Sequence, residues 1–258
     1  MKIRAVGTGA KFCRHPLTPA SWLVVSNTDL TLVGAPWNIV PTLHRYGHDI
    51  TKIAVIMILS PHMDQVAGLV ELAAIFKEIK KKPSLVAPAK LLQLIRDKVE
   101  PELGFFLDEA FNLKAVTKVM IKEEYFSESI SFVANYMHPY LPSYGLRFET
   151  AKVFLSGETK LNEDWLYKEM SCDLILHACN TLGNTIGAAP SLKEIEELPM
   201  YLQSKIWLYG YEVQTKENVQ PFPMMFVPPG AWVFDSERRD KLLSKERFIR
   251  ENSKKQLD

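Results

Sequence analysis

An imidazole and a carboxylate lie two positions apart in the segment Leu59–Leu69, which reads Leu-Ser-Pro-His-Met-Asp-Gln-Val-Ala-Gly-Leu. The segment follows one apolar run and opens an amphipathic one, so we expect it on a loop between a strand and a helix. His62 can serve as a metal ligand or as a hydrogen-bonding group inside a cleft. Asp64 can ligate a metal, or it can cap a helix that begins near Gln65. These residues alone leave both alternatives open.

The apolar pattern around this segment predicts the elements that must position it. Short runs rich in β-branched residues predict strands at Ile3–Val6, Ser21–Val25, Leu30–Val33 and Ile53–Leu59. Helical spacing of apolar residues predicts helices at Val66–Lys82, Ala89–Val99 and Ser191–Leu198. Further strands are expected at Val116–Ile121, Ile130–Tyr136, Gly145–Thr150, Lys152–Leu155, Asp173–His177 and Lys205–Tyr209. Strands in two runs without strict βαβ alternation favour two packed sheets with helices outside.

Several segments in a fixed order resemble the motifs of the metallo-β-lactamase superfamily. The segment at His62 resembles the family signature Thr-His-x-His-x-Asp-His-x-x-Gly, which also stands between a strand and a helix. The turn Ser156–Thr159 and the segment Tyr144–Phe148 look closest to the phosphodiesterase and ribonuclease Z-like branches of the superfamily. The other matching segments are Val6–Ala10, Leu30–Gly34, Met137–Pro139, Tyr144–Phe148, Val153–Thr159, Asp173–Ala178 and Lys205–Tyr211. The resemblance covers roughly 1–235 and implies a four-layer αββα sandwich.

The resemblance also implies a metal site, and this chain keeps only part of it. In binuclear members the family's ligands hold two ions, usually zinc, iron or manganese. The positions that still carry ligand types are His62, Asp64, His138 and Glu158. The family's histidines are replaced at Ser60, Gln65 and Gly210, and the aspartate of the early strand becomes Gly34.

The ligand count decides which chemistry the resemblance leaves possible. A catalytic zinc ion needs about three protein ligands and an open position. His62, His138 and Glu158 could supply one such site, whereas the second would have only Asp64 and the shared Glu158. We therefore expect no tightly bound metal, or at most one zinc, iron or manganese ion, and no two-metal clamp for a phosphoryl group.

Two functions from different classes remain. The first is a degenerate member that acts as a binding, sensory or scaffold module. The alternative is a mononuclear hydrolase of a phosphodiester or a related ester, in which Asp64 would be catalytic. Among the other histidines, His177 is expected to be a satisfied core residue. Pro41 and Gly47 argue against a helix that presents His44 and His48 to a metal.

Composition excludes several other classes of protein. Of 258 residues 47% are hydrophobic and 24% are charged, which is typical of a soluble globular chain. The net charge of +1 provides no field that would attract nucleic acid. Three cysteines without a Cys-x-x-Cys pair, and a start without a secretory signal, favour the cytoplasm and no membrane partner.

The segment 236–258 is rich in charge and differs from the rest of the chain. We expect a solvated, helical tail after a domain at 1–235. A helix that binds a partner is the alternative, since Leu242, Leu243, Phe248 and Ile249 could provide an apolar side. A homodimer or a protein partner is therefore possible from the sequence.

Overall fold

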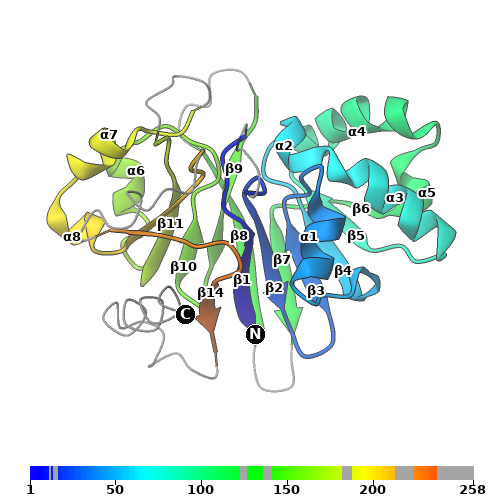
Figure 1. Cartoon of the computed structure of the whole chain (residues 1–258), viewed down its shortest axis with the longest axis horizontal. Coiled ribbons are helices and arrows are strands. Elements are labelled where there is room, and N and C mark those ends of the chain that lie inside the picture. Colours follow the sequence, from blue (N-terminus) through cyan, green and yellow to red (C-terminus); the bar gives the residue numbers. More distant parts are fainter. Residues whose placement is uncertain are drawn as a thin grey trace.

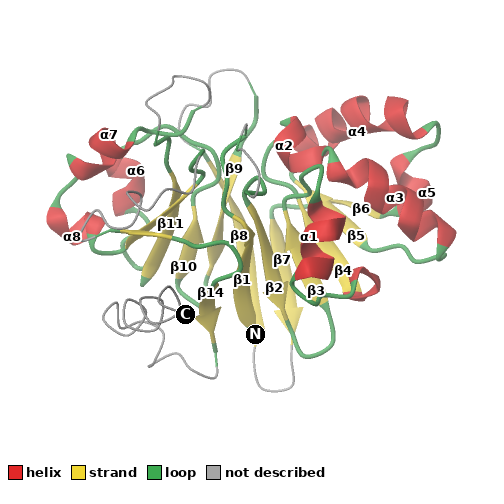
Figure 2. Ribbon diagram, viewed as in Figure 1, coloured by secondary structure: helices red, strands yellow, loops and turns green. Residues whose placement is uncertain are grey.

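The computed structural model describes residues 1–11, 13, 17–122, 127–135, 141–181, 188–212 and 224–236. Within these residues two sheets pack face to face, and helices cover both outer sides (Figures 1 and 2). The layers follow the order helix, sheet, sheet, helix. The αββα sandwich expected from the sequence is therefore confirmed.

The first sheet has seven described strands and joins the two ends of the described chain. The antiparallel strand β1 lies between β2 and β14, and Lys2 stands opposite Asp235 in this pairing. From β3 onward the pairings become parallel. The order across the sheet is β14 (Trp232–Asp235), β1 (Lys2–Gly7), β2 (Ser21–Val25), β3 (Leu30–Val33), β4 (Ile53–Met57), β5 (Ser84–Ala87) and β6 (Asn112–Ala115).

Helices cover the outer face of this sheet because their apolar stripes need a partner. Leu69, Leu72 and Phe76 of one such helix are fully buried in a cluster with residues of the sheet. The elements on this side are α1 (Ile39–Arg45), the 3-10 turn η1 (Ile50–Lys52), α2 (Met63–Val66), α3 (Gly68–Glu78), α4 (Ala89–Leu103) and α5 (Leu107–Ala110).

The second sheet also has seven described strands, in the order β13 (Met225–Phe226), β12 (Ile206–Tyr209), β11 (Leu174–Ala178), β10 (Val153–Leu155), β9 (Tyr144–Phe148), β8 (Ser127–Ala134) and β7 (Lys118–Lys122). Its outer face carries α6 (Glu163–Tyr167), α7 (Leu192–Glu196) and α8 (Met200–Gln203). Between the two sheets lies a separate apolar core that includes Trp22, Met57, Phe148 and Leu176.

Two of the differences from the sequence expectations concern the helices near His62 and His44. The helical segment begins at Met63, before the expected position, and is divided at Ala67 into α2 and α3. A helix does form around His44, because Pro41 stands in its first turn, where a missing N–H costs nothing. His48 lies beyond the end of this helix, so the two histidines do not share it.

His177 is a core residue, as expected, but only one of its two ring nitrogens has a hydrogen-bond partner among the described residues. Its side chain is fully buried on β11, and Nδ1–H donates to the carbonyl oxygen of Ala178 at 2.7 Å. Nε2 has no partner among the described residues. Burial lowers the pKa of this imidazole to about 4.

The buried imidazole predicts a measurable dependence of stability on pH. Between pH 6.5 and about 4 the unfolded state binds the proton and the folded state does not, so stability falls as the pH falls. We expect His177 to remove about 2 kcal/mol of stability between pH 7 and pH 5. Urea unfolding of wild type and His177→Leu at both pH values checks this, because the variant should lose that part of the slope.

The matched control is Ile175→Val on the same strand. Its loss of stability should be the same at every pH, because the substitution removes apolar volume and no titratable group. Equal pH slopes in the wild type and His177→Leu would contradict the assignment.

No helix among the described residues combines the length and the apolar character needed to cross a membrane. The charged tail expected at 236–258 lies outside the described residues, apart from Ser236.

Candidate functional site

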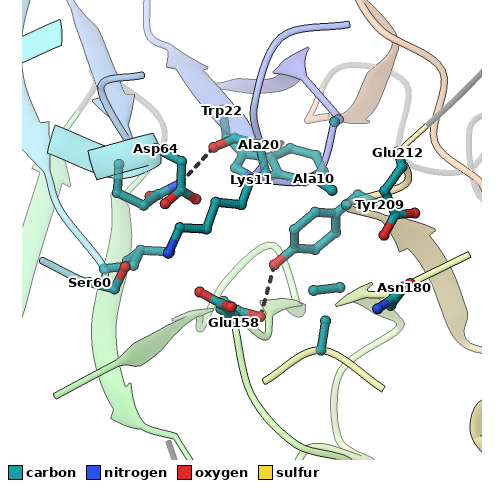
Figure 3. A pocket seen from close by; sticks show the side chains of 17 residues that line it. Ala10, Lys11, Ala20, Trp22, Ser60, Asp64, Glu158, Asn180, Tyr209 and Glu212 are labelled. Atoms are coloured by element: carbon teal, nitrogen blue, oxygen red, sulfur yellow. Dashed lines mark hydrogen bonds between the residues drawn. The ribbon is translucent and has the colours of Figure 1, made fainter. Parts of the chain in front are cut away.

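A cleft opens where strands of both sheets end, and it contains the segment that the sequence singled out. Ser60 and Asp64 follow β4, Gly157 and Glu158 follow β10, and Gly210 follows β12. The cleft encloses about 700 Å³, part of it open to solvent (Figure 3). Its other lining residues are Gly9, Ala10, Lys11, Ala20, Trp22, Leu59, Gln65, Ala178, Asn180, Ala189, Tyr209 and Glu212.

Backbone hydrogen bonds hold the two sheets together at this cleft. The amide of Tyr144 donates to the carbonyl oxygen of Leu59 at 2.9 Å and so fixes the end of β4 to the start of β9. The amide of Gly210 donates to the carbonyl oxygen of Thr8 at 2.7 Å and fixes β12 to the end of β1. The cleft walls therefore belong to both sheets and are positioned by rigid backbone.

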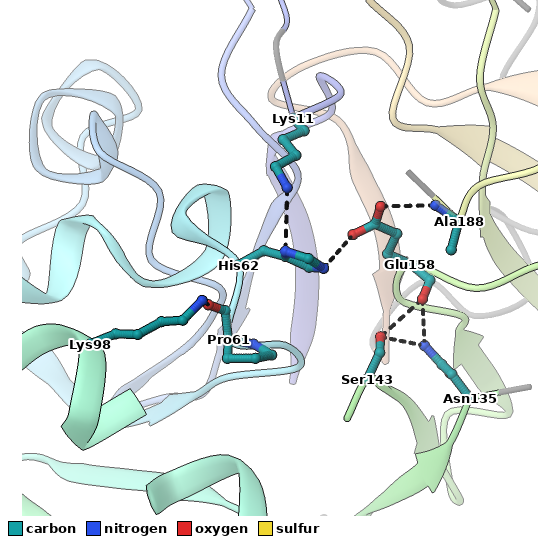
Figure 4. Close-up of polar contacts among 8 residues, drawn as sticks. All are labelled: Lys11, Pro61, His62, Lys98, Asn135, Ser143, Glu158 and Ala188. Atoms are coloured by element: carbon teal, nitrogen blue, oxygen red, sulfur yellow. Dashed lines mark hydrogen bonds and ion pairs between the residues drawn. The ribbon is translucent and has the colours of Figure 1, made fainter. Parts of the chain in front are cut away.

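His62 occupies the N-cap position of α2, and Asp64 lies in the first turn of that helix. No side chain caps the helix. The capping role considered for Asp64 is therefore not found, because the helix begins at Met63, one residue before it. The ammonium group of Lys98 on α4 donates to the carbonyl oxygen of Pro61 at 2.7 Å and holds this loop against the helix layer (Figure 4).

A chain of polar contacts runs across the cleft through His62. The ammonium group of Lys11 donates to Nδ1 of His62 at 3.3 Å, and Nε2 of His62 lies 3.7 Å from Oε2 of Glu158 (Figure 4). The amide of Ala188 donates to Oε1 of Glu158 at 3.1 Å. The side chains of His62 and Glu158 are 16% and 21% exposed, so solvent only partly screens the contact. An imidazole that accepts at Nδ1 carries its hydrogen on Nε2, on the side of Glu158.

The backbone of Glu158 is held as firmly as its carboxylate. Its carbonyl oxygen accepts from Nδ2 of Asn135 at 3.0 Å and from Oγ of Ser143 at 2.9 Å. Next to it, the hydroxyl of Tyr209 donates to the carbonyl oxygen of Gly157, the residue before Glu158, at 3.2 Å. Burial raises the pKa of Tyr209, so this hydroxyl remains a neutral donor.

Asp64 is the most perturbed carboxylate of the cleft. Burial, and after it the negative charge of Glu158, raise its pKa to about 6, while the positive charge of Lys11 opposes that shift. Oδ1 of Asp64 and Oγ of Ser60 are both buried, and neither has a hydrogen-bond partner among the described residues. Both side chains line the cleft.

Gln65 and Gly210 stand where the superfamily has metal-binding histidines, and both have structural roles in this chain. The amide of the Gln65 side chain donates to the carbonyl oxygen of Ala20 at 2.9 Å. A Cβ on Gly34 would stand only 2.8 Å from Oε1 of Gln65, so this side chain uses the space that a residue larger than glycine would need. Gly210 has a φ of +82°, a left-handed conformation that a residue with a side chain rarely adopts.

Of the four proposed ligand positions, Asp64 and Glu158 line the cleft, and His62 lies beside it in contact with Glu158. His138 lies outside the described residues, so its approach to His62 stays a prediction. Sequence reasoning missed Lys11, Asn180 and Glu212. Each follows a segment that the resemblance includes, but only their position in the fold shows that they line the cleft.

These residues do not fit the family's binuclear metal centre. Among the described residues, no group of three or more His, Cys, Asp and Glu side chains could hold a metal ion. The lone pair on Nδ1 of His62 accepts a hydrogen from Lys11, and the amide of Gln65 is bound to backbone. Two-metal chemistry therefore has no ligand set in the described part of the cleft.

The fold is that of a metallo-β-lactamase-type protein. Solved structures that share the fold include a diphosphatase from the PhnP family, with 14% identity, a TM-score of 0.71, and coverage of 91% of this chain and 98% of that one. The metallo-β-lactamase fold protein YhfI from Bacillus subtilis has 14% identity and a TM-score of 0.68, with 90% and 97% covered. The short form of human tRNase Z has 12% identity and a TM-score of 0.63, with 91% and 99% covered.

The particular family follows from the sequence itself. The profile of the family described as Anti-Pycsar protein Apyc1 matches residues 1–232, and this chain belongs to that family. A search of curated proteins finds no significant match.

Proposed function

We propose that this chain is a degenerate member of its fold that uses the former metal cleft as a ligand-binding site, in a sensory or scaffold role. The observation that carries the proposal is the contact between Lys11 and His62. A positively charged side chain stands among the ligand types that would otherwise converge on a metal ion.

The charge of Lys11 acts directly against a bound metal. Two unit charges about 4 Å apart interact by about 4 kcal/mol at an effective dielectric constant of roughly 20, and a divalent ion doubles that repulsion. The ammonium group also stabilises the ionised form of Asp64, which a metal would otherwise do. The cleft thus carries its own fixed cation.

The other replaced positions support the same conclusion. Ser60 provides a hydroxyl where the family has an imidazole, Gln65 is committed to the backbone, and Gly210 has no side chain. A catalytic site needs about three ligands for each ion, together with a position for water. A cleft that retains shape and polarity without these ligands is suited to binding and not to two-metal hydrolysis.

One observation favours the alternative, a mononuclear hydrolase of a phosphodiester or related ester. His62 and Glu158 lie 3.7 Å apart, close enough for both to ligate one ion if Lys11 moved away. His138 would be the third ligand of such a site. The printed names of two similar structures, a diphosphatase and tRNase Z, belong to this class of chemistry.

Removal of the ammonium group tests the proposal. We expect wild-type protein, purified without a histidine tag, to contain less than one equivalent of transition metal. Lys11→Ala should bind Zn²⁺ or Mn²⁺ at least about tenfold more tightly, because Nδ1 of His62 can then carry the hydrogen, which leaves Nε2 free to ligate beside Glu158, and because a repelling charge is removed. Elemental analysis and calorimetric titration measure both quantities.

Lys90→Ala is the control. Lys90 is exposed on α4, so this substitution removes the same charge outside the cleft. It should leave metal affinity unchanged. Two metals per wild-type chain would overturn the proposal. So would turnover of a phosphodiester that is lost in both His62→Ala and His138→Ala.

A further inference from the structure

Two polar atoms at one wall of the cleft lack the partners that buried polar atoms normally have. Ser60 is only 2% exposed, and its Oγ is unpartnered among the described residues, as is Oδ1 of Asp64. In Figure 3 these side chains and the amine of Lys11 lie on one side of the cleft, away from Asn180 and Glu212. Each unpaired buried group has lost its bonds to water without replacement, and a ligand with matching groups would supply them.

The charges of the lining exclude strongly charged ligands. The carboxylates of Asp64 and Glu158 would repel a phosphate or a carboxylate at this wall. The ammonium groups of Lys11 and Lys98, which both act on Asp64 against the charge of Glu158, would repel a ligand amine at the same place. An uncharged ligand meets neither repulsion.

The available hydrogen-bonding groups define the ligand further. Glu212 already accepts from the amide and the hydroxyl of Thr181 at 3.1 and 2.7 Å, and Glu158 accepts from Ala188. The free positions are therefore a carboxylate acceptor at Asp64 and a hydroxyl at Ser60 that both donates and accepts. A ligand hydroxyl also does both, so two neighbouring hydroxyls satisfy this pair of groups.

The remaining walls suit the carbon skeleton of such a ligand. Trp22 and Tyr209 pack edge to face with ring centroids 5.3 Å apart, and both line the cleft. Leu59, Ala178 and Ala189 add aliphatic surface beside them. Apolar walls with a few polar groups at one end are the usual construction of a small-molecule site.

We propose that the wall formed by Ser60, Asp64 and Lys11 binds two neighbouring hydroxyl groups of an uncharged ligand, such as a free sugar or the ribose of a nucleoside. Ser60 and Asp64 bond to the hydroxyls, and Lys11 donates from the side. The inference rests on the proposed function, because a metal at this place would occupy the same groups.

Titration of the full chain with matched ligands tests this inference by saturation-transfer NMR and calorimetry. The probes are D-ribose, 2-deoxy-D-ribose, adenosine, inorganic phosphate and putrescine. We expect D-ribose or adenosine to bind with millimolar affinity or better, and 2-deoxy-D-ribose to bind at least about fivefold more weakly than D-ribose. Adenosine binding without ribose binding would identify the nucleoside as the source of the diol.

Two variants connect the binding to the named atoms. Ser60→Ala and Asp64→Asn should each weaken binding by about five- to tenfold. Ser129→Ala is the matched control, because Oγ of Ser129 is also buried and unpartnered but lies on β8 outside the cleft lining. It should leave binding unchanged, and thermal unfolding confirms that each variant is folded.

The outcomes separate this inference from the proposed function. Metal-free protein that binds no diol at about 50 mM, or binds phosphate or putrescine more tightly than the diols, overturns the diol site alone. Protein that contains two metals per chain overturns the proposed function itself.

Discussion

Arg147→Ala is expected to lower the free energy of unfolding by about 3–4 kcal/mol, since breaking a buried ion pair leaves one charge without a partner. Nε of Arg147 donates to Oε2 of Glu169 at 2.7 Å, and a second guanidinium nitrogen donates to Oε1. The side chain of Glu169 is 1% exposed, so its carboxylate would remain buried and unpaired. Arg147 itself is 31% exposed, which places the expected cost toward the lower end for buried pairs.

The pair joins β9 to the segment after α6, so urea unfolding at neutral pH should show the loss directly. Glu169→Gln keeps one acceptor and should cost less, about 1–2 kcal/mol. Lys77→Ala is the matched control, because its partner Glu109 is exposed and such surface pairs contribute less than about 1 kcal/mol. If Arg147→Ala costs no more than Lys77→Ala, the buried pair does not stabilise the sandwich.

The fold was predictable where apolar runs were long or clearly bounded. The strands Ser21–Val25 and Leu30–Val33 have the expected bounds, because turn residues separate β-branched runs there. The strand Ser84–Ala87 was missed, since four residues between Pro83 and Pro88 give no periodicity. The helix Ile39–Arg45 is not predicted, because Pro41 indicates a break in the pattern, although a proline in the first turn of a helix is tolerated.

The site was predictable only where a local motif carried it. His62 and Asp64 stand at the start of α2, and their position follows from the strand before this helix. The contact between Lys11 and His62 joins residues 51 positions apart, and nothing in either local sequence encodes it. It depends on how the first and fourth strands lie in one sheet, which only the three-dimensional fold provides.

Gly157→Ala should be as damaging as the loss of Arg147, with an expected cost of about 3–5 kcal/mol from backbone strain and a steric clash together. Gly157 has a φ of +66°, and a Cβ there would stand 2.2 Å from the carbonyl oxygen of Tyr144. That oxygen belongs to backbone that cannot move without disturbing β9. The turn would therefore shift, and Glu158 would move with it.

Gly104→Ala separates the two causes. Gly104 has a nearly equal φ of +68°, but a Cβ there would meet nothing within 4 Å. Conformational strain alone should cost about 1–2 kcal/mol at this position. The difference between the two variants in urea unfolding measures the steric clash at the cleft. Equal losses would show that the turn at Gly157 can change its conformation to accept a side chain. In that case the backbone would not fix the position of Glu158 or its contact with His62.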